Sequence, residues 1–162
     1  MWNLQRNMQQ HNIGNKMLKV AILGKLPSKM YAPFDDPEWE IWTCNKHKIP
    51  RFTRWFDIHK NPSLYDNDIN EKLITLDKYP LEEVINLLGG YYLNNSISYM
   101  IMYAVLLNAS EIRLYGVALN NDHEIRTHQR QGTREICMFA RGRGIKVWSY
   151  EPTLLEEYPL YC

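Results

Sequence analysis

Two polar side chains in this sequence have the types and spacing that acid–base chemistry requires. Asp57 and His59 lie two residues apart, so in an extended strand both side chains point to the same face. A carboxylate beside an imidazole can orient the ring as a general base. A simple hydrogen bond at the end of a strand would use the same two residues without any catalytic role. The sequence leaves both interpretations open, and His59 is the first candidate catalytic residue.

A second polar cluster lies at 123–130, where a helix is predicted to begin shortly after a strand. His128 is a second candidate base, and Arg130 carries a planar guanidinium that can bind a phosphate through two hydrogen bonds. The start of a helix also favours an anion, because its first N–H groups have no partner within the helix. The alternative is a solvated first turn, since charged residues usually lie on solvent-exposed faces.

Residues 19–28 (KVAILGKLPS) place a glycine and a serine directly after a run of apolar residues. Such a run is typical of a central strand that is buried on both faces. The residues after it then lie at the carboxyl edge of the sheet, where Gly24 lets backbone N–H groups approach a phosphate and Ser28 adds a hydroxyl. No dinucleotide fingerprint or Walker loop accompanies them, so a buried strand followed by a turn is the alternative interpretation.

The candidate residues require a scaffold that brings them to one edge. Further strands are predicted at 40–44, 54–59, 73–76, 111–117 and 145–148, and helices at 80–88, 97–107, 124–143 and 152–158. Asn45 follows the second strand as Ser28 follows the first, and Gly116 ends a later strand. The alternation of strands and helices predicts a three-layer α/β fold with a mainly parallel sheet. The main pocket is therefore expected at the carboxyl edge of that sheet.

Three segments of the chain together resemble one known family: 19–28, 42–45 (WTCN) and 96–119. They are similar to the Rossmann-like bacterial sialyltransferases that use CMP-sialic acid, and to related phage proteins of unknown function. The resemblance spans most of residues 19–150 and implies a Rossmann-like fold. It also implies that a nucleotide pocket is lined by Gly24, Pro27, Ser28 and Asn45.

The chain departs from that family's pattern in ways that affect the expected function. Lys25 and Leu26 stand where the sialyltransferases have a polar, glycine-rich turn, and Ala118 stands where related proteins carry an acidic residue. The chain is also much shorter than a full sialyltransferase. The leading hypothesis is therefore a protein that binds a nucleotide or a nucleotide-derived signal, and the likeness to phage proteins extends this hypothesis to a phage-encoded protein. The alternative is transfer or hydrolysis of a glycosyl group from a nucleotide-linked sugar.

Aromatic side chains offer a further way to hold a nucleotide base. Strand and helix periodicity explains Trp42, Trp55 and Trp148 as packing residues. Tyr31 and Trp39 lie in or next to a proline-rich loop and are the better candidates for stacking on a base.

Length and composition limit the remaining classes of function. A chain of 162 residues with 45% hydrophobic content can form one core, so 17–162 is predicted to be a single domain and 1–16 a flexible leader. A net charge of +1 argues against general nucleic-acid binding. The three cysteines are widely separated, with no C-x-x-C pair, so no metal site and no cofactor are expected. No segment is typical of a membrane span or a signal peptide, which favours a cytoplasmic protein, in the host cytoplasm if it is phage-encoded. The expected partner is a small nucleotide or nucleotide sugar, and a homo-oligomer is left open.

Overall fold

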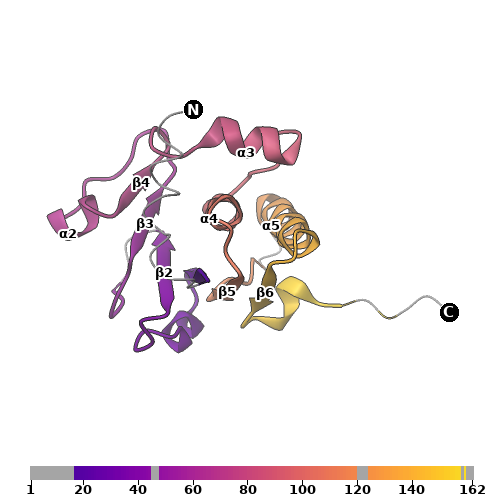
Figure 1. Cartoon of the computed structure of the whole chain (residues 1–162), viewed down its shortest axis with the longest axis horizontal. Coiled ribbons are helices and arrows are strands. Elements are labelled where there is room, and N and C mark those ends of the chain that lie inside the picture. Colours follow the sequence, from indigo (N-terminus) through magenta and orange to yellow (C-terminus); the bar gives the residue numbers. More distant parts are fainter. Residues whose placement is uncertain (1–16, 45–47, 120–123, 158, 160–162) are drawn as a thin grey trace.

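The fold is built on one parallel sheet. A computed structural model describes residues 17–44, 48–119, 124–157 and 159. Within them, six strands form a sheet in the order β4-β3-β2-β1-β5-β6, and every neighbouring pair is parallel (Figure 1). The strands are β1 (Lys19–Leu23), β2 (Trp39–Cys44), β3 (Arg54–Asp57), β4 (Leu73–Thr75), β5 (Glu111–Tyr115) and β6 (Lys146–Ser149). The predicted α/β fold with a mainly parallel sheet is confirmed.

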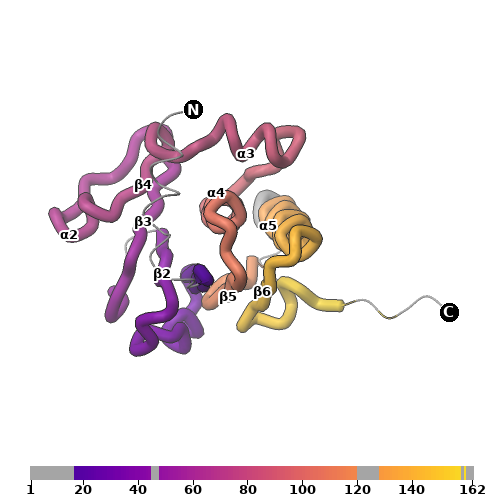
Figure 2. The backbone as a smooth tube through the Cα atoms, in the orientation of Figure 1, coloured from indigo at the N-terminus to yellow at the C-terminus, as the bar shows by residue number. Residues whose placement is uncertain are grey.

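The order of the strands reverses beside β1. The chain moves outward from β1 through β2 and β3 to β4, then returns to pair β5 with the other side of β1 and continues to β6. Figure 2 traces this path along the backbone. In open α/β sheets, the carboxyl ends of the strands at such a reversal form a crevice that binds ligands. By this rule, a crevice is expected between the ends of β1 and β5.

Helices cover one face of the sheet and build the larger core. They are α3 (Leu81–Leu88), α4 (Ser96–Leu106) and α5 (Glu124–Gly142) (Figure 1). Val20 and Ile22 of β1 belong to this core and are fully buried. α4 is apolar nearly all round, which suits its central position among the sheet and the other two helices. α3 ends at Gly89, which adopts the left-handed conformation (φ 73°) common after the last helical turn.

The other face of the sheet has a smaller core under an irregular segment. Ala21 and Leu23 of β1 pack there with residues of the 24–38 segment, which contains the short 3-10 helix η1 (Pro27–Tyr31). Arg51 holds this segment in place, because its Nε donates to the carbonyl oxygen of Phe34 (2.8 Å) and its Nη2 to that of Asp36 (2.9 Å). The cover lies over β1 and β2, so the two faces of the sheet are covered unequally.

The predicted elements differ from the structure mainly at their ends. β3 ends at Asp57 rather than at residue 59, and the final helix is the 3-10 helix η2 (Pro152–Leu155). α2 (Asn67–Asn70) and η1 have no counterpart in the prediction. The predicted leader 1–16 lies outside the described residues. Among the described helices, none combines the length and apolar character that crossing a membrane requires.

Candidate ligand-binding pocket at the carboxyl edge

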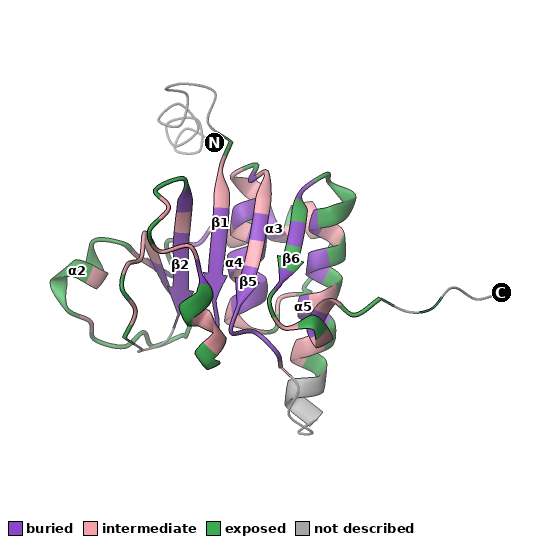
Figure 3. Ribbon diagram, turned by 90° about the horizontal axis from the view of Figure 1, so that it is seen from below, coloured by how far each residue is buried: buried purple, intermediate pink, exposed green. Residues whose placement is uncertain are grey.

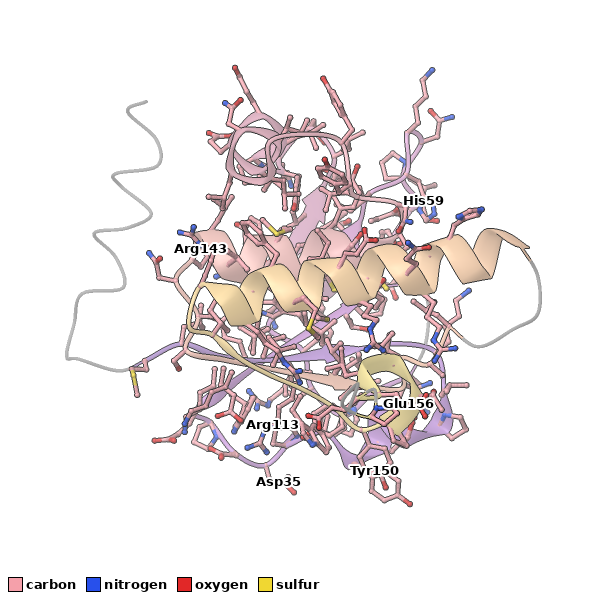
Figure 4. All side chains as sticks on the ribbon, turned by 90° about the vertical axis from the view of Figure 1, so that its right-hand side faces the viewer. Asp35, His59, Arg113, Arg143, Tyr150 and Glu156 are labelled. Atoms are coloured by element: carbon pink, nitrogen blue, oxygen red, sulfur yellow. The ribbon has the colours of Figure 1, made fainter. Side chains whose placement is uncertain are left out.

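A cavity of about 720 Å³ lies where the strand order reverses. Its walls come from the residues that follow β1, β3 and β5, from the last residue of β2 and from the start of α4. This volume lies within the usual range for pockets that hold a small molecule or a cofactor. In Figure 4 the labelled pocket residue His59 lies at the end of the molecule where α5 begins, and Arg143 lies at the opposite end. The cavity is therefore the candidate functional site of this fold.

Two glycines bring the ends of β1 and β5 together at the base of the cavity. A Cβ atom added to Gly24 would lie 2.3 Å from the carbonyl oxygen of Gly116, and Gly116 itself has a φ of +71°. The Gly24 N–H donates to the Tyr115 carbonyl (2.7 Å), and the Leu26 N–H donates to the Gly116 carbonyl (3.1 Å). Both glycines are therefore required by the close approach of two chain segments, and the Gly24 N–H is already used within the protein.

Lys25 lies between these two donors and is the main positive charge of the cavity. Its side chain is exposed and lines the cavity. Within the described residues, neither its backbone N–H nor its ammonium group has a hydrogen-bond partner. An anion in the cavity could accept from both groups. In the sequence, Lys25 stands out only as a departure from a family pattern, although its place directly after the strand-end glycine could have identified it.

Asp57 and His59 form a fixed pair at the rim of the cavity. Asp57 is the last residue of β3, and only 3% of it is exposed. Its Oδ2 accepts hydrogen bonds from the Ser63 N–H and the Tyr65 hydroxyl, both at 2.8 Å. Its Oδ1 accepts from the His59 N–H at 3.3 Å and lies 2.5 Å from His59 Nδ1. The predicted strand-end pair is thus present, and three residues hold the carboxylate in place.

These hydrogen bonds determine the charge of Asp57 and the orientation of His59. Burial raises the pKa of Asp57, but the hydrogen bonds from Ser63, His59 and Tyr65 outweigh burial, so the pKa lies below its ordinary value. Burial together with Asp57 raises the pKa of Tyr65, which therefore stays a protonated donor. A charged carboxylate requires His59 to carry hydrogen on Nδ1. His59 Nε2 is then the basic nitrogen, and no described residue bonds to it.

The start of α4 forms a further wall of the cavity and is fastened to α5. Asn95 caps α4, since its Oδ1 accepts from the N–H groups of Ile97 (3.0 Å) and Ser98 (3.2 Å). Asn95 Nδ2 donates to Thr133 Oγ1 on α5 at 2.8 Å. Ser96 lines the cavity, and its N–H and hydroxyl have no partner among the described residues. The wall is therefore rigid and retains two hydrogen-bond donors at a helix N-terminus.

The predicted site residues divide into two groups. Gly24, Gly116 and His59 line the cavity. Pro27, Ser28, His128 and Arg130 are not among its described lining residues. Asn45 lies outside the described part of the chain.

Ser28 and Arg130 instead fasten the segment that follows β6. The Ser28 hydroxyl donates to Glu151 Oε1, and Arg130 Nη2 donates to the carbonyl oxygen of Thr153. We call Ser28, Arg130, Glu151 and Thr153 the η2 strap, because they hold η2 against η1 and α5. His128 is exposed on α5, and its backbone carbonyl accepts from Asn94 Nδ2 (2.8 Å). A role for these residues in ligand binding stays a prediction, and the pocket is built without them.

The rest of the cavity lining is mainly apolar. Ile58, Leu93 and Leu119 contribute aliphatic surface, and Tyr99 contributes an aromatic ring. Cys44 also reaches the lining, but burial raises the pKa of its thiol to about 12, so it stays protonated and unreactive. No group of three or more metal-binding side chains occurs among the described residues. The cavity thus combines polar groups from the ends of β1 and β3 and from the start of α4 with apolar surface.

Comparison of the chain with protein-family models, with curated proteins and with solved structures finds no match. The resemblance to the sialyltransferases therefore stays a prediction. The function has to be argued from the geometry of the cavity.

Proposed function

We propose that the protein binds a nucleotide or a nucleotide-derived signal in the cavity at the carboxyl edge of its sheet. The observation that carries this proposal is the position of Lys25 at the reversal of strand order, with an ammonium group and a backbone N–H unused by the described residues. Phosphate groups need such donors, and crevices of this kind in parallel sheets commonly hold nucleotides.

The two parts of a nucleotide fit the two parts of the cavity. Its phosphate would accept hydrogen bonds from Lys25 and from the N–H and hydroxyl of Ser96. Its base and sugar would lie against the apolar walls formed by Ile58, Leu93 and Tyr99. A largely apolar pocket with a few convergent polar groups is the usual form of a small-molecule site.

Catalysis is the second candidate function, and the Asp57–His59 pair favours it. A buried carboxylate that accepts from Nδ1 leaves Nε2 able to take a proton from a hydroxyl group or from water. On a nucleotide-linked sugar, that oxygen would bond to the anomeric carbon and the nucleotide would leave with the electrons of the glycosidic bond. A protein that only sequesters its ligand has no need of an oriented base.

A thermal-shift screen tests the binding proposal. The panel comprises nucleoside mono-, di- and triphosphates, cyclic nucleotides and nucleotide sugars. A ligand at about 100 times its dissociation constant should stabilise the protein by about 2.7 kcal/mol. The Lys25→Ala variant should weaken binding of that ligand, whereas Lys78→Ala, a lysine outside the cavity lining, should not. Equal affinities of wild type and Lys25→Ala would contradict the proposed phosphate position.

Recovery of the ligand separates the two candidate functions. The ligand is incubated with the protein, the protein is removed by heat, and the ligand is analysed by chromatography. Unchanged ligand indicates sequestration. A cleaved product that the His59→Ala variant fails to form would indicate catalysis.

A further inference from the structure

The sheet face opposite the helices is open over β6 and the middle of β5, whereas Tyr115 at the end of β5 is buried in the smaller core. Ile112, Leu114 and Val147 of these strands point into the helical core, so the alternating residues between them point to the other side. Figure 3 views the sheet from that side, with α4 and α5 behind the strands. Figure 4 likewise shows Arg113 and Tyr150 on the opposite side of the sheet from α5. This surface is separate from the cavity proposed to bind a nucleotide.

Aromatic side chains occupy the uncovered surface. We call Tyr31, Trp148 and Tyr150 the aromatic platform, and the buried ring of Tyr115 (5% exposed) lies against Trp148 and Tyr150. The rings of Tyr31 and Tyr150 are stacked, with centroids 5.0 Å apart, and Trp148 lies 5.6 Å from Tyr115 and 6.0 Å from Tyr150. Tyr31 is 68% exposed, Trp148 45% and Tyr150 40%. Polar residues usually face water on an open sheet, so exposed and contiguous aromatic rings mark a binding surface.

Positive charge adjoins the aromatic platform. A shallow cavity of about 700 Å³ next to Trp148 is lined by Arg113, Arg141 and Lys146, and Glu111 is its only described carboxylate. Glu111 already pairs with Arg113 at 2.7 Å. The Arg113 guanidinium also lies 6.0 Å from the centre of the Trp148 ring. Cations therefore outnumber carboxylates here, although the whole chain has a net charge of only +1.

Pairing with another β-strand is disfavoured at this edge of the sheet. Arg141 donates through both Nε (3.2 Å) and Nη2 (2.8 Å) to the carbonyl oxygen of Val147 in β6. An added strand would need that carbonyl as an acceptor, so the arginine protects the edge. A partner for this surface must therefore bind to side chains on the face of the sheet.

We propose that the aromatic platform and its adjoining cations bind single-stranded nucleic acid. Unpaired bases can stack on exposed Trp and Tyr rings, and Arg113 and Lys146 can contact the phosphates between them. Tyr, Trp and Arg are also enriched at protein interfaces, so a second copy of this chain is the competing occupant in the test below. Duplex bases are stacked on one another and cannot reach the rings. Only a few phosphates are contacted, which agrees with the nearly neutral chain.

Fluorescence anisotropy with a labelled 12-nucleotide oligouridylate tests the proposal. Wild type should bind it at micromolar protein concentration in 50 mM salt, and more weakly in 200 mM salt. Trp148→Ala should weaken binding about tenfold or more, because it removes a stacking surface. Tyr91→Ala removes another exposed ring, outside the platform, and should bind like wild type. A duplex of the same length should bind at least tenfold more weakly than the single strand.

Three outcomes would overturn the proposal: no binding at 100 μM protein, equal binding of the duplex, or equal affinities of wild type and Trp148→Ala. Circular dichroism checks that each variant is folded. If Trp148→Ala does not fold, Lys146→Ala, at an exposed position, replaces it in the binding test. Light scattering measures the oligomeric state and so tests for the competing occupant, a second copy of this chain. A dimer that Trp148→Ala dissociates would mean that the platform is an interface between copies and would also overturn the proposal.

Discussion

The cavity and the η2 strap lie at the same edge of the sheet but use their polar side chains differently. In the strap, the Ser28 hydroxyl and the Arg130 guanidinium bond to another segment of the same chain. In the cavity, His59 bonds to Asp57 through one ring nitrogen only, and the N–H and ammonium group of Lys25 have no acceptor among the described residues. Both regions contain residue types that could bind a phosphate.

Unused hydrogen-bonding capacity that a ligand can reach is what separates the two regions. Glu151 Oε2 in the strap has no hydrogen-bond partner among the described residues either, but it is buried away from solvent. His59 lines the cavity, and 70% of its side chain is exposed. Residue type alone therefore does not identify a site in this protein. The following predictions test the difference, in order of decreasing expected effect.

Gly24→Ala should have the largest effect on stability, because it disrupts the packing of the two chain segments at the base of the cavity. The added Cβ would meet the backbone of Gly116, which cannot move without disturbing β5. We expect the free energy of unfolding to fall by about 2–3 kcal/mol in urea denaturation. Gly142→Ala is the matched control, since a Cβ there meets nothing within 4 Å. Similar stabilities of the two variants would refute the close-approach explanation.

Asp57→Asn should reduce stability by about 2 kcal/mol at pH 7, because an amide cannot accept all the hydrogen bonds of the carboxylate. The folded-state pKa of Asp57 is lowered, so its stabilisation is fully present above the unfolded pKa of about 4. That stabilisation is lost as the pH falls through the folded pKa. Urea denaturation from pH 7 to pH 3 should therefore show a smaller acid-induced fall in the free energy of unfolding for the variant than for wild type. An identical pH dependence would show that Asp57 titrates normally.

Arg130→Ala should reduce stability by about 1.5 kcal/mol, since it removes a charge-assisted hydrogen bond to the η2 segment. Ligand affinity in the cavity should stay within about twofold of wild type. Arg143→Ala, an exposed arginine at the other end of α5, is the control and should change stability by less than about 0.5 kcal/mol. A large loss of ligand affinity in Arg130→Ala would show that Arg130 contributes to ligand binding.

His59→Ala should have the smallest effect on stability, below about 0.5 kcal/mol, because its side chain is mostly exposed. If the protein is an enzyme, the same variant should lose turnover and keep most of its affinity, since a general base acts mainly in the transition state. Urea denaturation and a product assay measure the two effects separately. A strongly destabilised variant would mean that the ring mainly supports the fold around Asp57.

The sequence predicts the scaffold well because its strands are local patterns. Apolar runs place β1 and β3. The spacing of Asp57 and His59 predicts their hydrogen bond, although β3 ends at Asp57 and His59 lies beyond the strand. The partners of Ser28 and Arg130 could not be predicted, because Glu151 and Thr153 are distant in sequence and meet them only in the folded chain.

Periodicity also fails at Trp148, which was predicted to be a packing residue. It alternates correctly with buried residues of β6, but the 24–38 segment that covers this face over β1 leaves Trp148 45% exposed. Trp39, predicted to stack on a base, is instead 5% exposed beneath the 24–38 segment. A strand pattern shows which residues share a face, whereas the tertiary fold decides whether that face is covered.

A titration followed by amide chemical shifts in two-dimensional NMR tests the central claim most directly. The titrant is the nucleotide with the largest effect in the thermal-shift screen. We expect the largest shifts at Lys25, His59 and Ser96, and unchanged signals at Glu151 and Thr153. Large shifts in the η2 strap, with Lys25 and Ser96 unchanged, would contradict the assignment of the cavity as the ligand site.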